Sequence, residues 1–430
     1  MWAQSGGGGA GYGGPAVSSR GLRGAGSRAG EAVSIRPYVA ATGVYDSGLI
    51  VAGVTPDGGI TNPGGLFGVE VQVGVYGAKD WRKTRIGMDY AGLYRHYSAA
   101  SFYNGSDHLI EMDITHQVAR RISFLVRGTA GTSSRPVGGL FSLAYLDPTR
   151  FGIPSGDIFD NRSYFVDASG QLVFEIGAKS SASISGNGFA VRRQSSALIG
   201  MNGHRAAADF TRRVTRRTTI GAGYQYIHFD FPRFFGESDI HLVLGEVARE
   251  ITRSLRVSAA VGGYRSDLAG VRDVQLDPVL VALFGVTTGR QAFNAINYLP
   301  FGQFAVQHDQ RRSSLMVSFS TGPTGGGGVL LTSKQQTAQV NWSFRGTEKW
   351  SWGFTGFYQD FGGLGSFQGQ TQTYGLGANF SRRIRGDLFL SGGATTRRFV
   401  ASLTNDFQRT GNRITLGLTY SPGAVPVSLR

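Results

Sequence analysis

The sequence contains no cysteine and no long apolar segment. None of its 430 residues is Cys, which excludes disulfides, thiolate catalysis, zinc ribbons and iron–sulfur clusters. No run of about 18 consecutive apolar residues occurs, so a transmembrane helix is excluded. The opening residues Met1–Gln4 have neither a charged segment nor an apolar segment, and we therefore expect no signal peptide in the chain as given.

Glycine, aromatic residues and positive charge are abundant instead. The chain has 66 Gly, 12% aromatic residues and a net charge of +15. Its glycine content is about twice the average of ~7%, but no Gly-X-Y period is present, so collagen is excluded. So many aromatic residues are not typical of a disordered chain. Residues 1–33, which contain the run Gly6–Gly9, are expected to form a flexible extension.

Apolar and polar residues alternate in many segments. Between Val69 and Val75 the odd positions are all valine, while the even positions are Glu70, Gln72 and Gly74. The same period of two occurs at 86–90, 110–115, 122–127, 338–344 and 414–420. A period of two predicts strands with one apolar and one polar face. Because no long segment has a helical period, we predict an all-β protein.

Short basic segments separate the strands at regular intervals. Most of them are about 37 residues apart, as expected for a repeated hairpin unit. Eight such turns would divide the chain into about 18 strands, within a range of 16–20. A β-propeller also repeats at ~40–45 residues, but its blades need four short strands, whereas each period here has two longer ones. The turn segments are residues 79–85, 116–122, 177–183, 210–217, 249–256, 307–313, 345–351 and 382–388.

The apolar strand faces would pack either as the core of a sandwich or against lipid. Two girdles of aromatic residues at the strand ends favour lipid, although ordinary core aromatics are the alternative. Trp81, Trp342, Trp350 and Trp352 lie at the short-turn ends, and Tyr94, Tyr226 and Tyr358 at the other ends. We therefore predict a closed antiparallel transmembrane β-barrel with a polar, water-filled lumen. The residues expected to face the lumen are Glu70, Arg85, Asp89, Glu111, Asp113, Arg127, Glu175, Arg205, Asp209 and Gln339.

Several short stretches are similar to the bacterial outer-membrane porins. These stretches are Arg36–Tyr38, Gly43–Gly48, Tyr94–Tyr97, Ile158–Arg162, Phe229–Phe231 and Tyr420–Gly423. The chain resembles this family over about residues 34–420. More narrowly, it resembles porin-like barrels of which some are associated with exopolysaccharide export. The resemblance implies an outer-membrane location in a Gram-negative-type bacterium, with short periplasmic turns and longer extracellular loops.

The last residues differ from the usual pattern of such barrels, which end in an aromatic residue. Here Tyr420 is followed by residues 421–430, which we expect to form a tail. The signal read by the barrel-assembly machinery is therefore expected at Ile414–Tyr420.

Candidate catalytic groups are sparse. The seven His have no metal-binding spacing. His96 and Ser98, with Asn104 nearby, resemble part of the site of outer-membrane phospholipases, but polar loop-end residues are the simpler interpretation. The pairs Asp107/His108 and Asp239/His241 are candidates for a protease site without further support, and Gly325–Gly328 lacks the Lys-Ser/Thr of a phosphate-binding loop. We expect no enzyme, no cofactor and no metal.

Two longer, irregular segments, at 131–162 and 267–294, interrupt the repeat. They are either solvated loops or an infolded constriction, in which Arg135, Asp157, Arg272 and Asp277 would orient small polar solutes. The sequence thus predicts a channel for small polar or charged solutes. The alternatives are an export pore for an anionic exopolysaccharide and a structural or adhesive barrel that does not conduct.

The net positive charge is concentrated in the turns. The eight turn segments contain 21 Lys/Arg and 5 Asp/Glu, so the rest of the chain has almost no net charge. A ring of basic turns predicts contact with phospholipid headgroups. Dispersed arginines do not suit nucleic acid. The expected partners are therefore outer-membrane lipids, the assembly machinery, an unknown solute and, in a homo-oligomer, a second copy.

Overall fold

The alternating segments of the sequence form long β-strands. The computed structural model describes residues 32–48, 64–98, 104–134, 161–233, 235–275, 287–328, 330–344, 349–364, 369–402, 406–422 and 425–428. These residues form nineteen strands and one short 3-10 turn, η5 (Gly326–Gly328). All but the last strand exceed the ~9–11 residues that a tilted strand needs to cross a bilayer.

The strands follow one another along the chain with the following bounds: β1 (Ala32–Asp46), β2 (Leu66–Asp80), β3 (Thr84–Tyr97), β4 (Gly105–Ala119), β5 (Ile122–Ser133), β6 (Ser163–Glu175), β7 (Ser180–Arg193), β8 (Met201–Arg213), β9 (Thr218–Phe231), β10 (Gly236–Glu250), β11 (Leu255–Gln275), β12 (Thr288–Asp309), β13 (Ser313–Thr324), β14 (Ser333–Phe344), β15 (Trp350–Gly363), β16 (Gln370–Arg385), β17 (Leu388–Ser402), β18 (Asp406–Tyr420) and β19 (Val425–Ser428).

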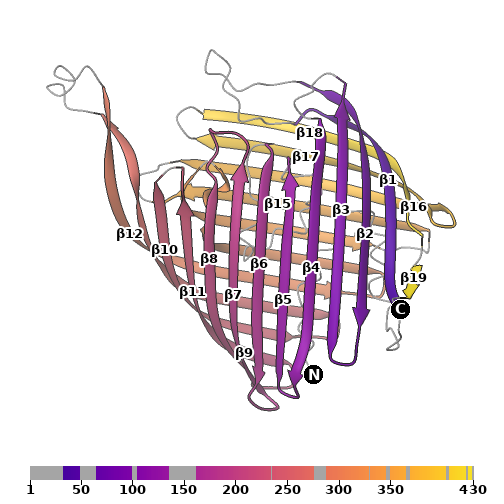
Figure 1. Ribbon diagram of the computed structural model, residues 1–430, viewed down its shortest axis with the longest axis horizontal. Coiled ribbons are helices and arrows are strands. Elements are labelled where there is room, and N and C mark those ends of the chain that lie inside the picture. The colour runs from indigo at the N-terminus through magenta and orange to yellow at the C-terminus, as the bar shows by residue number, and fades with distance from the viewer. Residues whose placement is uncertain are drawn as a thin grey trace.

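The first eighteen strands close into a ring (Figure 1). Each strand pairs antiparallel with the next, and β18 pairs with β1 from Val39↔Tyr420 to Asp46↔Arg413. The short strand β19 continues this edge by pairing with Ala32–Ile35. The closed antiparallel barrel of about 18 strands is thus confirmed. Closure removes the unpaired edges that an open sheet would leave.

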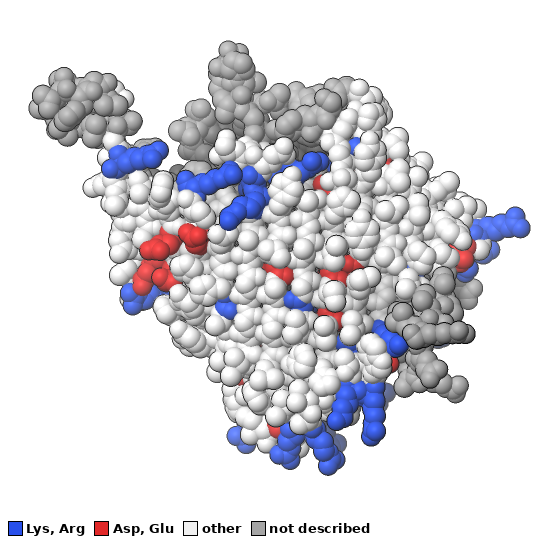
Figure 2. All heavy atoms as spheres, in the orientation of Figure 1, with Lys and Arg blue, Asp and Glu red and all other residues white. Residues whose placement is uncertain are grey.

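Connections differ in length between the two ends of the barrel. At one end, here called the short-turn end, the eight connections have two to five residues, whereas at the other, the long-loop end, they have from three to 29. All eight basic segments identified in the sequence overlap a connection at the short-turn end. Figure 2 shows Lys and Arg side chains projecting from this end, at the bottom of the view. The basic ring is therefore a property of one rim.

Alternation gives the wall two different faces. On β2, Val69 is 53% exposed and the next residue, Glu70, is 6% exposed. The same contrast recurs around the barrel, where Ile110, Val126, Val340 and other apolar side chains are exposed on the outer face. Most of the flank seen in Figure 2 is correspondingly free of charged atoms. This outer face matches what lipid requires and the inner face suits water.

One hairpin extends beyond the rest of the barrel. Strands β11 and β12 have 21 and 22 residues, and residues 288–301 of β12 pair with β11 alone, because pairing with β13 begins only at Gly302. Figure 1 shows this hairpin rising above the rim at the upper left. The expectation of an irregular segment at 267–294 is therefore wrong for 267–275 and 288–294, which are paired strands.

Among the described residues, no helix has the length and apolarity needed to span a membrane.

Candidate functional site

The inner wall of the barrel is the candidate functional site. The ten residues expected to face the lumen all lie on the strand face opposite to exposed apolar side chains such as Val69, Met112 and Phe210. Two of them, Arg85 and Glu175, are exposed close to the short-turn end, and Arg85 lies 3.6 Å from Asp80. The other eight, which are half-buried or buried, lie further along the wall: Glu70, Asp89, Glu111, Asp113, Arg127, Arg205, Asp209 and Gln339.

Four of these residues meet on neighbouring strands β3, β4 and β5. The register places Asp89 opposite Glu111, and Asp113 opposite Arg127. Arg127 also lies 3.5 Å from Glu111. These four residues comprise three carboxylates and one guanidinium group, so together they carry a net negative charge. Such a patch attracts cations from the lumen.

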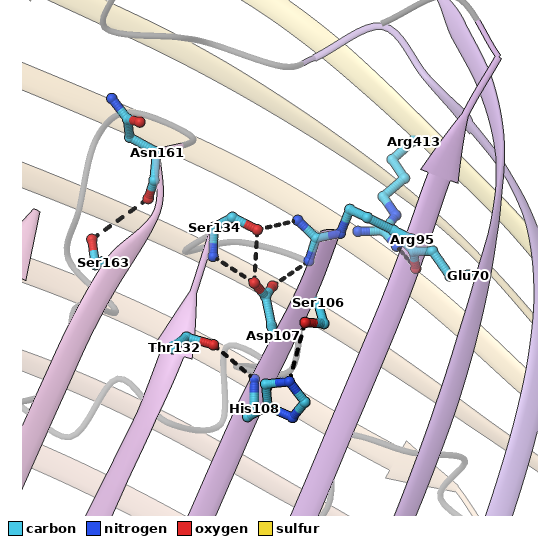
Figure 3. Close-up of polar contacts among 10 residues, drawn as sticks. All are labelled: Glu70, Arg95, Ser106, Asp107, His108, Thr132, Ser134, Asn161, Ser163 and Arg413. Atoms are coloured by element: carbon cyan, nitrogen blue, oxygen red, sulfur yellow. Dashed lines mark hydrogen bonds and ion pairs between the residues drawn. The ribbon is translucent and has the colours of Figure 1, made fainter. Parts of the chain in front are cut away.

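Two buried ion pairs near the long-loop end were missed by sequence reasoning (Figure 3). Arg413 of β18 donates a hydrogen bond to Glu70 of β2 at 2.5 Å, across the intervening strand β1. Arg95 of β3 pairs with Asp107 of β4, which also accepts hydrogen bonds from the backbone and side chain of Ser134. Each arginine balances the charge of its carboxylate in a region withdrawn from water. The sequence gives one signal for these pairs: Arg95 and Arg413 alternate with residues that face outward.

The connection between β13 and β14 folds back against the inner wall. Leu331 is 2% exposed and belongs to the same buried cluster as Phe229, Phe231 and Ile240 on β9 and β10. The backbone of Gly328 accepts a hydrogen bond from Ile199 at 2.9 Å. Three consecutive glycines, 326–328, have positive φ values of 72°, 60° and 85°, which other residues rarely adopt. This infolded segment (residues 325–328 and 330–332) narrows the lumen at the long-loop end.

One of the four predicted constriction residues lies in the described part of the chain. Arg135, Asp157 and Asp277 are outside the described residues. Arg272 lies on β11, in the hairpin that extends above the rim. Sequence reasoning therefore missed the segment that does fold inward in the described part of the chain. Its signal was present as a run of glycines followed, after Val329, by Leu330 and Leu331, because two leucines in a loop need an apolar surface to cover them.

The inner wall from β14 to β16 is polar but uncharged over the middle of its strands. Beside the buried rings of Phe357 and Phe361 on β15, most of its side chains are amides and hydroxyls, which can exchange hydrogen bonds with a passing solute without attracting one sign of charge. In the ring order, strands β5 to β7 lie opposite this part of the wall. The buried members of this set are Ser333, Thr337, Gln339, Gln359, Thr371 and Thr373.

Aromatic and basic side chains meet on the outer face at the short-turn end. Trp350 stacks on Trp352 with ring centroids 5.8 Å apart, and Trp342 lies on the adjacent strand, 5.4 Å from Phe354. Arg382 lies 4.8 Å from the ring of Trp350, a cation–π arrangement. At β2, Lys79 similarly lies 5.0 Å from the ring of Trp81. Amphipathic rings beside cations suit a lipid headgroup layer.

The second set of predicted aromatics lies toward the long-loop end. Tyr94 is 55% exposed on the outer face, and the rings of Tyr358 and Tyr374 are 5.1 Å apart. The hydroxyl of Tyr226 donates to Asp239 at 2.5 Å. The two predicted sets of interface aromatics thus lie near opposite ends of the strands, separated by the apolar band.

The candidate catalytic residues do not form a catalytic arrangement. Asn104 lies 3.1 Å from the His96 ring nitrogen, but the hydroxyl of Ser98 donates to the backbone carbonyl of Phe67. His228 and Tyr226, rather than a second carboxylate, contact Asp239. Among the residues that the structure describes, no group of three or more His, Asp or Glu could hold a metal ion.

An apolar outer band, a polar inner wall and aromatic rims on a closed eighteen-strand ring define a transmembrane β-barrel. No family model matches the sequence, and no curated protein matches it.

Solved structures provide a likeness of overall architecture. OpdQ from Pseudomonas aeruginosa has a TM-score of 0.42 and 10% identity, covering 92% of this chain and 98% of that one. A BenF-like porin from Pseudomonas fluorescens Pf-5 has a TM-score of 0.43 and 11% identity, covering 92% and 99%. The ferric-catecholate import receptor Fiu from E. coli K12 has a TM-score of 0.42 and 7% identity, covering 92% and 82%. The barrel assignment itself rests on the strand pairing of this chain.

Proposed function

We propose that this protein is an outer-membrane channel through which small polar or charged solutes diffuse. The observation that carries the proposal is the polar inner wall of a closed eighteen-strand ring. A barrel of this size is wide enough for an aqueous lumen unless loops or a plug fill it. Charged side chains such as Asp89, Asp113 and Arg127 are half-buried on that wall, which suits contact with water rather than with an apolar core.

The infolded segment supports a selective channel rather than a wide, open one. It packs against β9 and β10 and also contacts β14 and β15, so it covers part of the lumen at the long-loop end. A solute that passes there would meet uncharged hydrogen-bonding groups on one side and the charged patch of β3 to β5 on the other. Solutes with several hydrogen-bonding groups suit such a passage.

The basic rim supports an orientation in the membrane. Short turns lie on the periplasmic side of outer-membrane barrels, and there the paired basic and aromatic residues at Trp81 and Trp350 would contact the phospholipid headgroups.

Conductance of the purified protein in a planar lipid bilayer tests the proposal. We expect stable, stepwise increases in current, and electrophoresis without heating should show a compact band that shifts on boiling. Leu331→Ala, which loosens the infolded segment, should raise the step size, whereas the outer-face variant Val340→Ala should not.

An intact barrel without conductance would overturn the proposal and favour a structural or adhesive barrel. Conductance that is blocked by an anionic polysaccharide from the periplasmic side, but by no small solute, would instead favour export of such a polymer.

A further inference from the structure

The inner wall contains a cavity near Asp209. It has a volume of about 120 Å³ and is open toward the lumen. Its lining comes from the consecutive strands β8 to β14, so the cavity is a hollow in one continuous part of the wall. Asp209 and Glu246 supply its two charged groups, and none of its described lining residues is basic.

The two carboxylates converge over the same strand because that strand has glycines beneath them. Asp209 on β8 lies opposite Gly223 of β9, and Glu246 on β10 lies opposite Gly221. A side chain at either glycine would collide with the carboxylate that lies over it. The glycines thus let both acids lean over β9 from either side. The two carboxylates are near enough to repel one another.

The protein neutralises the negative charges of these two carboxylates only in part. Asp209 accepts a hydrogen bond from Ser183 and feels the positive charge of Arg205. For Glu246, the electrostatic neighbour is Asp209 itself. Two carboxylates that repel each other beside a lumen are stabilised when a cation binds between them.

The rest of the lining suits an organic group rather than a bare ion. Leu242, Leu244 and Phe301 form an apolar side, and the amides of Gln225 and Gln335 lie at its border. An apolar hollow with a few convergent polar groups is the usual character of a small-molecule site.

We propose that this cavity binds small organic cations, with an ammonium group between Asp209 and Glu246 and an aliphatic portion against Leu242, Leu244 and Phe301. The site lies on the wall of the channel, so its role in transport rests on the function proposed above. Its chemistry selects ammonium or guanidinium solutes over neutral and anionic solutes of the same size.

Three probes that share a four-carbon chain test the proposal: putrescine, 1,4-butanediol and succinate. Each is added to single channels of the purified protein in a planar bilayer. We expect putrescine to interrupt the current, and the diol and the dicarboxylate at the same concentration not to. Equal interruption by all three probes would overturn the proposal.

Substitutions of the two carboxylates test whether putrescine blocks the current at this cavity. Glu246→Gln and Asp209→Asn should each raise the half-blocking concentration of putrescine about tenfold, and the double variant more. The matched control is Glu237→Gln, because Glu237 lies on the same strand but is exposed on the outer face. Its half-blocking concentration should stay within about twofold of the wild type. Block that persists in the double variant, or that weakens equally in Glu237→Gln, would overturn the site.

Failure of this site and failure of the channel are distinguishable. A wild-type protein that conducts but is not blocked refutes the site alone. If the folded wild type does not conduct, the channel is refuted, and the site is then tested by equilibrium dialysis of putrescine against the protein in detergent. Binding that is lost in the double variant would support the site, and an absence of binding to the wild type would overturn it.

Discussion

Breaking the ion pair between Glu70 and Arg413 tests how the two ends of the chain are held together. The two side chains are 343 positions apart in sequence and come from β2 and β18, on either side of β1. Glu70 is 6% exposed and Arg413 is 8% exposed. Removing one partner leaves a buried charge without its counterion, which costs about 3–5 kcal/mol in the free energy of unfolding.

The two single variants should differ in how much free energy of unfolding they lose. Asp46, which is fully buried, lies opposite Arg413 in the β1–β18 register, so Arg413 stands between two carboxylates. Arg413→Gln leaves both acids without that guanidinium, whereas Glu70→Gln leaves Arg413 beside Asp46. We therefore expect Arg413→Gln to destabilise at the upper end of the range, about 5 kcal/mol, and Glu70→Gln at the lower end, about 3 kcal/mol.

The assay is urea-induced unfolding in lipid vesicles, followed by tryptophan fluorescence and by the heat-shifted band on gels. The double variant should lose less than the sum of the two single losses, with a coupling energy of about 0.5–3 kcal/mol. The outer-face substitution Leu416→Ala, on the same strand as Arg413, reports the cost of perturbing β18 without touching the pair. Single variants as stable as the wild type, or a double variant whose loss is the simple sum of the single losses, would refute the reasoning.

Three further predictions concern packing. Leu331→Ala should lower the free energy of unfolding by about 2–5 kcal/mol, measured by the same urea titration, because this side chain is 2% exposed within the infolded segment. Trp352→Ala should reduce stability by about 0.5–1.5 kcal/mol and slow folding into vesicles, measured by the rate of gain of the compact band, and an unchanged rate would contradict an interfacial role. Gly74→Leu should destabilise by about 1–3 kcal/mol because the buried ring of Tyr38 occupies the space above Gly74, and Tyr38→Ala in the same chain should partly restore the urea midpoint.

The barrel could be predicted from the sequence because its signals are local and repeated. Alternation over a strand such as 69–76 depends on neighbouring residues, and the basic turns recur at every second connection. The prediction failed at 267–294, where β11 and β12 extend above the rim. In such a hairpin both faces lie outside the lipid zone, so residues such as Gln291 and Asn294 show no apolar alternation, and a paired strand is mistaken for a loop.

The site could be predicted only in part because its contacts depend on register between distant strands. Alternation placed Asp209 on the inner face, but it did not indicate that Glu246 lies across the same strand. Around Leu242 and Leu244 the chain is apolar on both faces, so β10 has no clear period of two. Nothing in the local sequence connects Glu70 with Arg413, and the infolding of residues 325–328 and 330–332 depends on a buried cluster built from other strands.

The pairing of β1 with β18 also dictates when the barrel can be completed. The first strand must wait for a partner from the far end of the chain, which is synthesised after all the other strands of the ring. Until then both edges of the growing sheet offer unpaired backbone groups to any other extended chain. The final ring contact is therefore the most non-local step of folding and the one most exposed to aggregation. A nascent chain of this design therefore has to keep the edge of its first strand unpaired until its last ring strand is available.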